Sequence, residues 1–227
     1  MTFGSLFAGI GGMDLGLERA GMECRWQVEN EPYCVKVLEK HWPEVKRYGD
    51  IKEIEWGEVE RVDLICGGFP CPVVSQAARG RNNGEWLWPE FARTIGHLQP
   101  NYVLVENVPG LLRGRIEEVV GDLASLGYVS EWATIPASAF GAPHRRARVW
   151  LVAYPNRHGE PTGTFYAETP FVPPDAGRTG DHWWNPDPWT LGMDDGVPNR
   201  VDRLRALGNA VVPQVAEWIG RRILESM

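Results

Sequence analysis

Cys71 stands where its thiol could act as a nucleophile. It ends the run Gly67-Gly68-Phe69-Pro70-Cys71, directly after the short apolar stretch Val62–Cys66. That stretch has the length and flanking glycines of a buried strand, so Cys71 is predicted to lie where the strand's carboxyl end opens into a loop. Ligands bind at this edge of an open α/β sheet, and a reactive thiolate needs an exposed, electropositive place. A buried structural cysteine is the alternative, because that is the commoner role of this residue type.

A glycine-rich turn near the amino terminus forms a second candidate site. The sequence Phe7-Ala8-Gly9-Ile10-Gly11-Gly12 ends a first apolar stretch and opens a helix-like one. Glycines at such a junction let the backbone and the helix amides approach a cofactor closely. Tight packing of a strand on a helix would also need them. The spacing differs from G-x-G-x-x-G, and no lysine follows the turn as phosphate binding would require.

Two acidic side chains strengthen the prediction of a cofactor pocket. Glu29 ends the second predicted strand, and Asp50 stands before Ile51 at the end of a third. A carboxylate at the first place can accept hydrogen bonds from ribose hydroxyls, and one at the second could accept from an adenine amino group. Together with the glycine turn, these acids predict a pocket for a nucleoside without phosphates.

The elements that position these residues alternate between strand-like and helix-like stretches. The predicted strands are Thr2–Ala8, Cys24–Val28, Val62–Cys66, Tyr102–Glu106, Tyr128–Ile135 and Val149–Ala153. The predicted helices are Gly12–Ala20, Pro32–Trp42, Trp86–Leu98, Ile116–Leu126 and Pro213–Leu224. Such alternation predicts an α/β fold with a mainly parallel sheet and helices on both faces. The last two strands are predicted to pair at one edge.

The chain divides into three parts by composition. Residues 1–154 carry the alternation of strands and helices and form the predicted catalytic domain. Residues 155–200 hold eight of the 18 prolines, six glycines and little periodicity, which predicts a small irregular lobe. Residues 201–227 return to the apolar patterning of a folded domain.

The overall composition excludes several classes of protein. With 43% apolar and 23% charged residues the chain is ordinary for a globular protein. No stretch has the length of a membrane span, and the first residues lack the basic start of a signal peptide. Four cysteines without paired metal-ligand spacing indicate no metal site and a reducing, cytoplasmic location. The formal charge of −7 argues mildly against a nucleic-acid partner, but a locally basic cleft can outweigh it.

The motifs match a known family in order and over nearly the whole chain. The sequence resembles the DNA cytosine-5 methyltransferases. The glycine turn resembles their motif for S-adenosyl-L-methionine (AdoMet), Glu29 and Asp50 the acids that bind its ribose and adenine, and Gly67–Cys71 their catalytic loop motif. The other matches are Glu106-Asn107-Val108, Arg146-Ala147-Arg148 and Gly208-Asn209-Ala210-Val211-Val212-Pro213.

The resemblance implies a Rossmann-like AdoMet-dependent methyltransferase fold, in which segment 201–227 returns to the catalytic domain and lines the cofactor pocket. It implies that AdoMet is held by Phe7, Gly9, Gly11, Gly12, Glu29, Asp50, Ile51, Asn209 and Val211.

It also implies a mechanism for methylation at carbon 5 of cytosine. Carbon 5 is a poor nucleophile, and addition of the Cys71 thiolate to carbon 6 would make the ring enamine-like. Glu106 would contact ring nitrogen 3 and the exocyclic amine and supply a proton. Arg148, with Arg146 nearby, would stabilise the developing charge at the exocyclic oxygen, and Asn107 would hold the Cys71 loop. A mutual ion pair would by itself also explain Glu106 and Arg148.

Three features depart from the family pattern. Pro72 stands where Gln is usual, and His144 where Gln is common. The region available for recognising DNA is short, and residues 155–200 carry seven acids against three arginines, the wrong sign for phosphate binding. Trp183 and Trp184 of this lobe either stack on bases or fill its small core. We therefore expect DNA to be gripped by arginines on the rim: Arg79, Arg81, Arg113, Arg115, Arg145, Arg146, Arg148, Arg200, Arg203 and Arg205.

The sequence thus predicts a monomeric DNA (cytosine-5-)-methyltransferase that acts on a base flipped out of double-stranded DNA, with a loop over residues 72–85 that closes on the target. The small size resembles that of phage or prophage enzymes, and restriction-modification is the expected setting. Two alternatives stay open. One is RNA (tRNA) as the substrate, because a tRNA-modifying branch of the family shares these motifs. The other is a catalytically weak AdoMet- or DNA-binding module.

Overall fold

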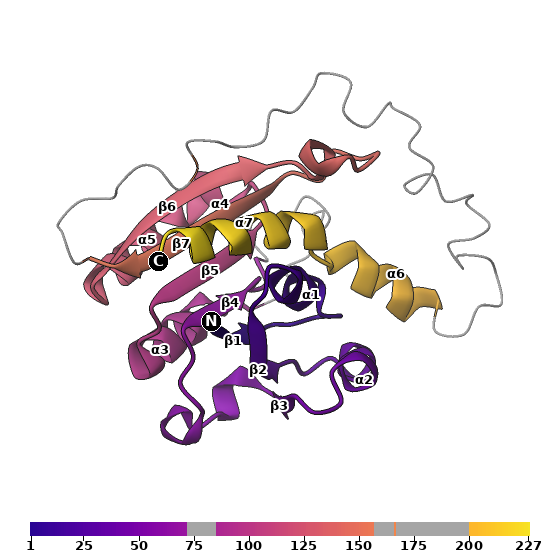
Figure 1. Cartoon of the computed structure of the whole chain (residues 1–227), viewed down its shortest axis with the longest axis horizontal. Coiled ribbons are helices and arrows are strands. Elements are labelled where there is room, and N and C mark those ends of the chain that lie inside the picture. Colours follow the sequence, from indigo (N-terminus) through magenta and orange to yellow (C-terminus); the bar gives the residue numbers. More distant parts are fainter. Residues whose placement is uncertain (72–84, 157–165, 167–199) are drawn as a thin grey trace.

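A computed structural model of the chain shows a seven-stranded sheet covered by helices on both faces (Figure 1). The structure describes residues 1–71, 85–156, 166 and 200–227. The strands are β1 (Thr2–Leu6), β2 (Glu23–Val28), β3 (Lys46–Tyr48), β4 (Leu64–Gly67), β5 (Tyr102–Asn107), β6 (Tyr128–Ile135) and β7 (Arg148–Pro155). The helices are α1 (Gly12–Arg19), α2 (Pro32–His41), α3 (Trp88–Leu98), α4 (Leu111–Gly114), α5 (Ile116–Ser125), α6 (Arg200–Asn209) and α7 (Pro213–Glu225).

The strand order creates a potential ligand site at the carboxyl ends of two strands. The order is β3-β2-β1-β4-β5-β7-β6. The first five strands run parallel, and β7 is antiparallel to both β5 and β6. Successive connections leave β1 toward β2 on one side and later toward β4 on the other. The carboxyl ends of β1 and β4 therefore flank a topological switch point, where open α/β sheets bind ligands.

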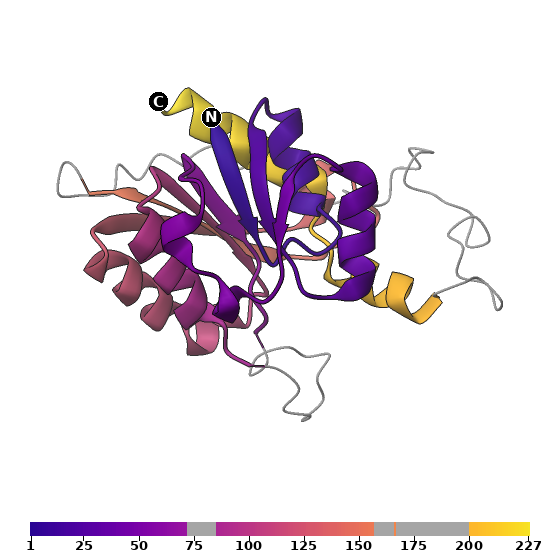
Figure 2. The ribbon, with the colours of Figure 1, turned by 90° about the horizontal axis from the view of Figure 1, so that it is seen from below.

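The two faces of the sheet carry separate apolar cores because successive strand residues point to opposite sides. In β4, Ile65 packs with α3 and α5, whereas its neighbours Leu64 and Cys66 pack with α1 and α7. Viewed from below, the sheet lies between these two helical layers (Figure 2). Burial on both faces holds the parallel strands in register and so fixes the residues that follow them.

The carboxyl-terminal segment returns to the first helix. A side-chain carbon added at Gly16 of α1 would lie 2.4 Å from the carbonyl oxygen of Pro213, and one at Gly12 would lie 2.5 Å from that of Val211. These glycines are required for the close approach of two backbones. No helix in the described part of the chain is long and apolar enough to cross a membrane.

Each of the predicted elements corresponds to an observed one within two residues at each end. The first ends at Leu6 rather than Ala8, and β7 extends further than predicted at its carboxyl end. The predicted edge pair is confirmed as the antiparallel strands β6 and β7. A strand end before Asp50 was predicted without bounds and corresponds to β3, whereas α6 was not predicted as an element. The division into parts at residues 154 and 200 stays a prediction, because the lobe at 155–200 lies almost wholly outside the described residues.

Candidate active site

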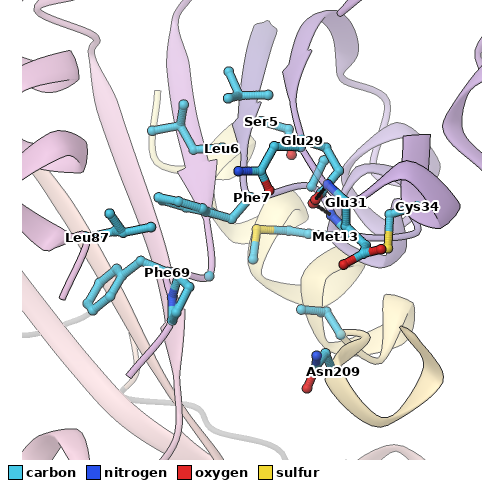
Figure 3. Close-up of a pocket in the computed structure, with 18 of the residues that line it drawn as sticks. Ser5, Leu6, Phe7, Met13, Glu29, Glu31, Cys34, Phe69, Leu87 and Asn209 are labelled. Atoms are coloured by element: carbon cyan, nitrogen blue, oxygen red, sulfur yellow. Dashed lines mark hydrogen bonds between the residues drawn. The ribbon is translucent and has the colours of Figure 1, made fainter. Parts of the chain in front are cut away.

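A pocket of about 670 Å³ opens at the switch point, between the ends of β1, β2, β4 and β5 and the returning segment 202–211 (Figure 3). Its volume is in the range of small-molecule and cofactor sites. Eight of the nine predicted cofactor residues line it: Phe7, Gly9, Gly12, Glu29, Asp50, Ile51, Asn209 and Val211. The predicted catalytic residues Cys71, Glu106, Asn107 and Arg148 line it too. Two predicted residues, Gly11 and Arg146, do not.

The glycine turn is shaped by backbone conformations that side chains disfavour. Phe7, Gly9 and Gly11 have φ of 53°, 57° and 80°, in the left-handed region where glycine is the preferred residue. Gly11 precedes α1, and a side-chain carbon there would collide with Trp42 at 2.3 Å. Gly11 therefore lets the turn pack against Trp42, whereas Gly9 and Gly12 line the pocket.

Both acids are held in place by backbone amides. The Glu29 carboxylate accepts hydrogen bonds from the amides of Gly9, at 2.7 Å, and Glu31, at 2.8 Å. Asp50 accepts one from the amide of Lys52 at 3.0 Å, at the start of a 3₁₀ turn. Each carboxylate oxygen can accept more than one hydrogen bond. The two acids are thus fixed at the pocket wall with acceptor capacity to spare.

The opposite side of the pocket carries an acid whose environment favours its protonated form. Burial raises the pKa of Glu106 to about 7, although Arg148 and Arg146 favour the ionised form. The Nε of Arg148 lies 3.0 Å from Oε1 of Glu106. A side-chain carbon at Gly68 would lie 2.7 Å from Oε2, so any larger residue at position 68 would force this carboxyl group to move. An acid with a pKa near neutrality can give or accept a proton at working pH.

Asn107 connects this acid to the cysteine. Its side-chain amide donates a hydrogen bond to the carbonyl of Phe69 at 3.1 Å, and its oxygen accepts one from the amide of Val108 at 2.8 Å. Phe69 stands two residues before Cys71. Cys71 is half-buried at the pocket, whereas Cys24, Cys34 and Cys66 are buried. Of the four thiols, only that of Cys71 has the partial exposure that a nucleophile needs.

Arg146 points to the returning segment. Its Nη2 donates hydrogen bonds to the carbonyls of Gly208 and Ala210, each at 2.7 Å. Its backbone has φ of 31°, a conformation that costs free energy in a residue other than glycine. Burial lowers the pKa of this guanidinium. Arg146 lines a small second cavity behind Glu106 rather than the main pocket.

Several pocket residues were missed by the sequence reasoning. Tyr33 and Cys34 come from α2, Lys52 from the turn after Asp50, and Glu85 and Leu87 from the segment before α3. From α6 come Asp202 and Ala206, beside Asn209, which was predicted, and Arg205, which was expected on the rim. These four have the spacing i, i+3, i+4 and i+7 of one helical face, so an α-helix predicted to end at Asn209 would have identified them.

Some predicted features lie outside the described residues. They include Pro72, the rest of the loop up to residue 84 with Arg79 and Arg81, and the lobe residues Trp183 and Trp184.

The fold is that of the Rossmann-like methyltransferases, and comparison with known proteins identifies the family. The model of the C-5 cytosine-specific DNA methylases matches residues 1–173. The chain belongs to that family.

Among curated relatives, the type II methyltransferase M.NgoMIV of Neisseria gonorrhoeae is 34% identical over 167 residues, which cover 70% of this chain and 54% of that protein. M2.BsuMI of Bacillus subtilis is 38% identical over 160 residues, covering 66% and 41%. M.NaeI of Lentzea aerocolonigenes is 31% identical over 225 residues, covering 89% and 52%. The chain thus spans about half the length of the curated relatives it matches.

Solved structures agree with the fold. A prophage-encoded Escherichia coli protein described as a putative DNA modification methyltransferase superposes with a TM-score of 0.57 at 25% identity, over 68% of this chain and 47% of that one. The Entamoeba histolytica methyltransferase EhMeth superposes with a TM-score of 0.66 at 14% identity, over 100% and 99%.

Proposed function

We propose that the protein transfers a methyl group from AdoMet to carbon 5 of cytosine in DNA. The observation that carries the proposal is that Cys71 and the Glu106–Arg148 pair line the same pocket as Glu29 and Asp50. Nucleophile, proton donor and cofactor acids thereby converge at one switch point, although they are up to 119 residues apart in the sequence.

The pocket residues fit AdoMet. Gly9 and Gly12 allow close approach of backbone, and the braced acids Glu29 and Asp50 offer acceptors for ribose hydroxyls and an adenine amino group. The turn offers no lysine for a phosphate. Gly11 supports the turn, and Asn209 and Val211 close the pocket from the carboxyl-terminal side. When bound, AdoMet supplies an electrophilic methyl group.

The chain's own residues then prepare the base. The Cys71 thiolate forms a bond to carbon 6 of cytosine, and protonated Glu106 gives a proton to nitrogen 3 as negative charge builds in the ring. Arg148 donates hydrogen bonds to the exocyclic oxygen and stabilises the same charge. Carbon 5 would thereby become nucleophilic and take the methyl group from the sulfur of AdoMet, which would leave as S-adenosyl-L-homocysteine. Loss of the carbon 5 proton to a base then breaks the bond between Cys71 and carbon 6, and nitrogen 3 returns its proton to Glu106.

Double-stranded DNA is the proposed substrate, with the target base flipped out of the helix because Cys71 cannot reach carbon 6 of a stacked base. In the described part of the chain, Arg113 and Arg203 are exposed and available to phosphates, whereas the exposed Arg205 forms an ion pair with Glu31 at 3.3 Å. A monomer stays the prediction for the oligomeric state.

Incubation with mixed-sequence DNA and radiolabelled AdoMet tests the proposal. We expect label in 5-methylcytosine, and a covalent protein–DNA adduct on DNA that carries 5-fluorocytosine, where the final proton loss is blocked. Cys71→Ala should abolish both while AdoMet binding by calorimetry is retained. A parallel incubation with tRNA distinguishes an RNA substrate. Label in tRNA alone, or full turnover by Cys71→Ala, would refute the proposal.

A further inference from the structure

Phe69 is held from two sides close to the proposed nucleophile. Its ring is buried and packs edge-on against Trp86, with ring centres 5.1 Å apart and planes at 90°. Trp88 and Phe91 contact it further at 5.4 and 6.2 Å. Its carbonyl is held by Asn107. Because Phe69 lies two residues before Cys71, its position limits where the thiol can lie. Figure 3 shows Phe69 and Leu87 along the same wall of the pocket.

Trp86 is itself fixed by two charged residues at the start of α5. The indole N–H donates a hydrogen bond to Oε1 of Glu118 at 2.7 Å. The Arg115 guanidinium lies over the ring, 4.5 Å from its centre, and binds Oε2 of Glu118 at 3.0 Å. Trp86, Arg115 and Glu118 therefore form a closed triangle of contacts. A cation over an indole ring and an N–H bond to a carboxylate together define both the position and the tilt of the ring.

The residues around Trp86 are tied down as well. Glu85 forms an ion pair with Lys52, whose own amide holds Asp50. Trp88 donates a hydrogen bond from its indole N–H to Asp122 at 2.8 Å, one helical turn beyond Glu118. The segment 85–88 is thus attached to α5 on one side and to the cofactor wall on the other.

We propose that Trp86, locked by Arg115 and Glu118, is a positioning residue for the Cys71 nucleophile and acts through the edge of the Phe69 ring. The inference rests on the proposed function, because it assigns to Trp86 the orientation of the thiol that attacks carbon 6. No element of the fold requires a tryptophan at this place, since α3 begins only at Trp88 and the ring is only partly buried.

Single-turnover methylation at saturating DNA and AdoMet tests this role. Trp86→Ala should lower the rate constant about tenfold, because a small displacement of a reacting group is costly, with AdoMet and DNA dissociation constants within twofold of the wild type. Trp86→Phe keeps an aromatic edge against Phe69 and should recover most of the rate. Arg115→Ala should slow the reaction, and adding it to Trp86→Ala should slow it no further, because Arg115 acts through Trp86.

Arg113→Ala is the matched control. Arg113 is an exposed arginine two residues before Arg115. If the two arginines only contacted phosphates, Arg113→Ala and Arg115→Ala would both weaken DNA binding. A rise in the DNA dissociation constant without a change in the rate constant for Trp86→Ala or Arg115→Ala would overturn the positioning role. So would Trp86→Phe reacting as slowly as Trp86→Ala, or additive losses in the double variant.

Alkylation of Cys71 by iodoacetamide, quantified by mass spectrometry, gives a readout that does not need methylation. Trp86→Ala should change the alkylation rate several-fold by releasing Phe69, and Trp86→Phe and Arg113→Ala should not. If the wild type methylates no DNA, the proposed function fails, and the alkylation rates still decide the role of Trp86. Equal rates in all variants would overturn it.

Discussion

At the scale of single residues, Cys71, Glu106 and Arg148 line one pocket, and the surroundings of Glu106 set the pKa of its carboxyl group. Cys71, Glu106 and Arg148 could be predicted because their motifs are local strings. Glu106 and Arg148 form the mutual ion pair that would by itself explain both residues, with the two charged groups 3.0 Å apart. It is compatible with catalysis, because burial raises the pKa of Glu106 in spite of it. The pKa of Glu106 depends on how deeply its carboxyl group is buried, and a local motif does not encode this burial.

Glu106 should produce a decline in the methyl-transfer rate on the alkaline side. The proposed role needs its protonated form, and its pKa lies at about 7 because of burial. The single-turnover rate constant should therefore fall as the pH rises through about 7. Glu106→Gln cannot give up a proton and should be slower by ~10²–10⁴-fold, without this decline. A pH series of single turnovers measures both effects.

The control for this prediction is cofactor binding, since Glu106 does not hold AdoMet in the proposed mechanism. AdoMet affinity measured by calorimetry should be unchanged in Glu106→Gln. If the variant showed the same decline near pH 7 as the wild type, the titrating group would be another residue.

At the scale of elements, apolar patterning was sufficient for the buried strands and for helices with one apolar face. It placed a strand end before Asp50 but gave no bounds for β3, a three-residue strand of sequence Lys-Arg-Tyr, because a short polar edge strand has no alternation to detect. It missed α6 because, among the described side chains of this helix, only the small Ala206 is both apolar and buried, and Val201 and Leu207 are exposed. Both elements flank the pocket, and Asp202 and Ala206 of α6 were missed as pocket residues.

Asp14 joins three elements and should give the fold a measurable pH dependence. This fully buried carboxyl group in α1 accepts hydrogen bonds from Ser5 of β1, at 3.0 Å, and Gln27 of β2, at 2.9 Å. Burial raises its pKa to about 6 from 3.8. The folded state then binds more protons than the unfolded state between about pH 4 and 6. The unfolding free energy should fall as the pH rises through this window, by at most about 3 kcal/mol, and level off above it.

Urea denaturation at several pH values, in the wild type and in Asp14→Asn, measures this contribution. Asp14→Asn should lack this pH-dependent contribution. The difference in unfolding free energy between the two proteins should therefore vary between pH 4 and 6. Asp63→Asn provides a control of opposite sign, because the amide of Thr2 lowers the pKa of Asp63. The stability that Asp63 contributes is present above its ordinary pKa and is lost in acid. A constant difference between wild type and Asp14→Asn would contradict the assignment.

Gly12 and Gly121 form a matched pair for testing the contact between α1 and the returning segment. A side-chain carbon at Gly12 would lie 2.5 Å from the Val211 carbonyl oxygen, whereas nothing lies within 4 Å of one at Gly121 in α5. Gly12→Ala should displace Val211 and weaken AdoMet binding by ~1–3 kcal/mol. Gly121→Ala should leave binding unchanged and stabilise the helix by ~0.5–1 kcal/mol. Calorimetry and thermal denaturation separate the two effects, and equal AdoMet affinity in both variants would argue against this contact.

At the scale of the whole molecule, the sequence could not by itself bring residues 202–211 to the glycine turn. That expectation came from the family resemblance. Alternating strands and helices predict a parallel sheet but not the order of its strands, because order depends on which apolar faces pack together over long distances in the chain. Arg146 illustrates the difference: its motif placed it beside Arg148, yet its side chain reaches carbonyls 62 and 64 residues further along the chain.

Substitutions of the two arginines in the Arg146-Ala147-Arg148 motif should therefore have different effects. Arg146→Ala leaves the carbonyls of Gly208 and Ala210 without their guanidinium donor. Hydrogen bonds from a charged group contribute ~1.5–3 kcal/mol, so the segment with Asn209 and Val211 should loosen and AdoMet affinity should fall about tenfold or more. Arg148→Ala removes the partner of Glu106 and should lower the single-turnover rate at saturating AdoMet while leaving cofactor affinity within a few-fold. Calorimetry for AdoMet and single-turnover kinetics on one DNA substrate separate these outcomes. If Arg146→Ala bound AdoMet as tightly as the wild type and lost only rate, Arg146 would act on the base, as its motif predicted, and the closing segment would need no support from it.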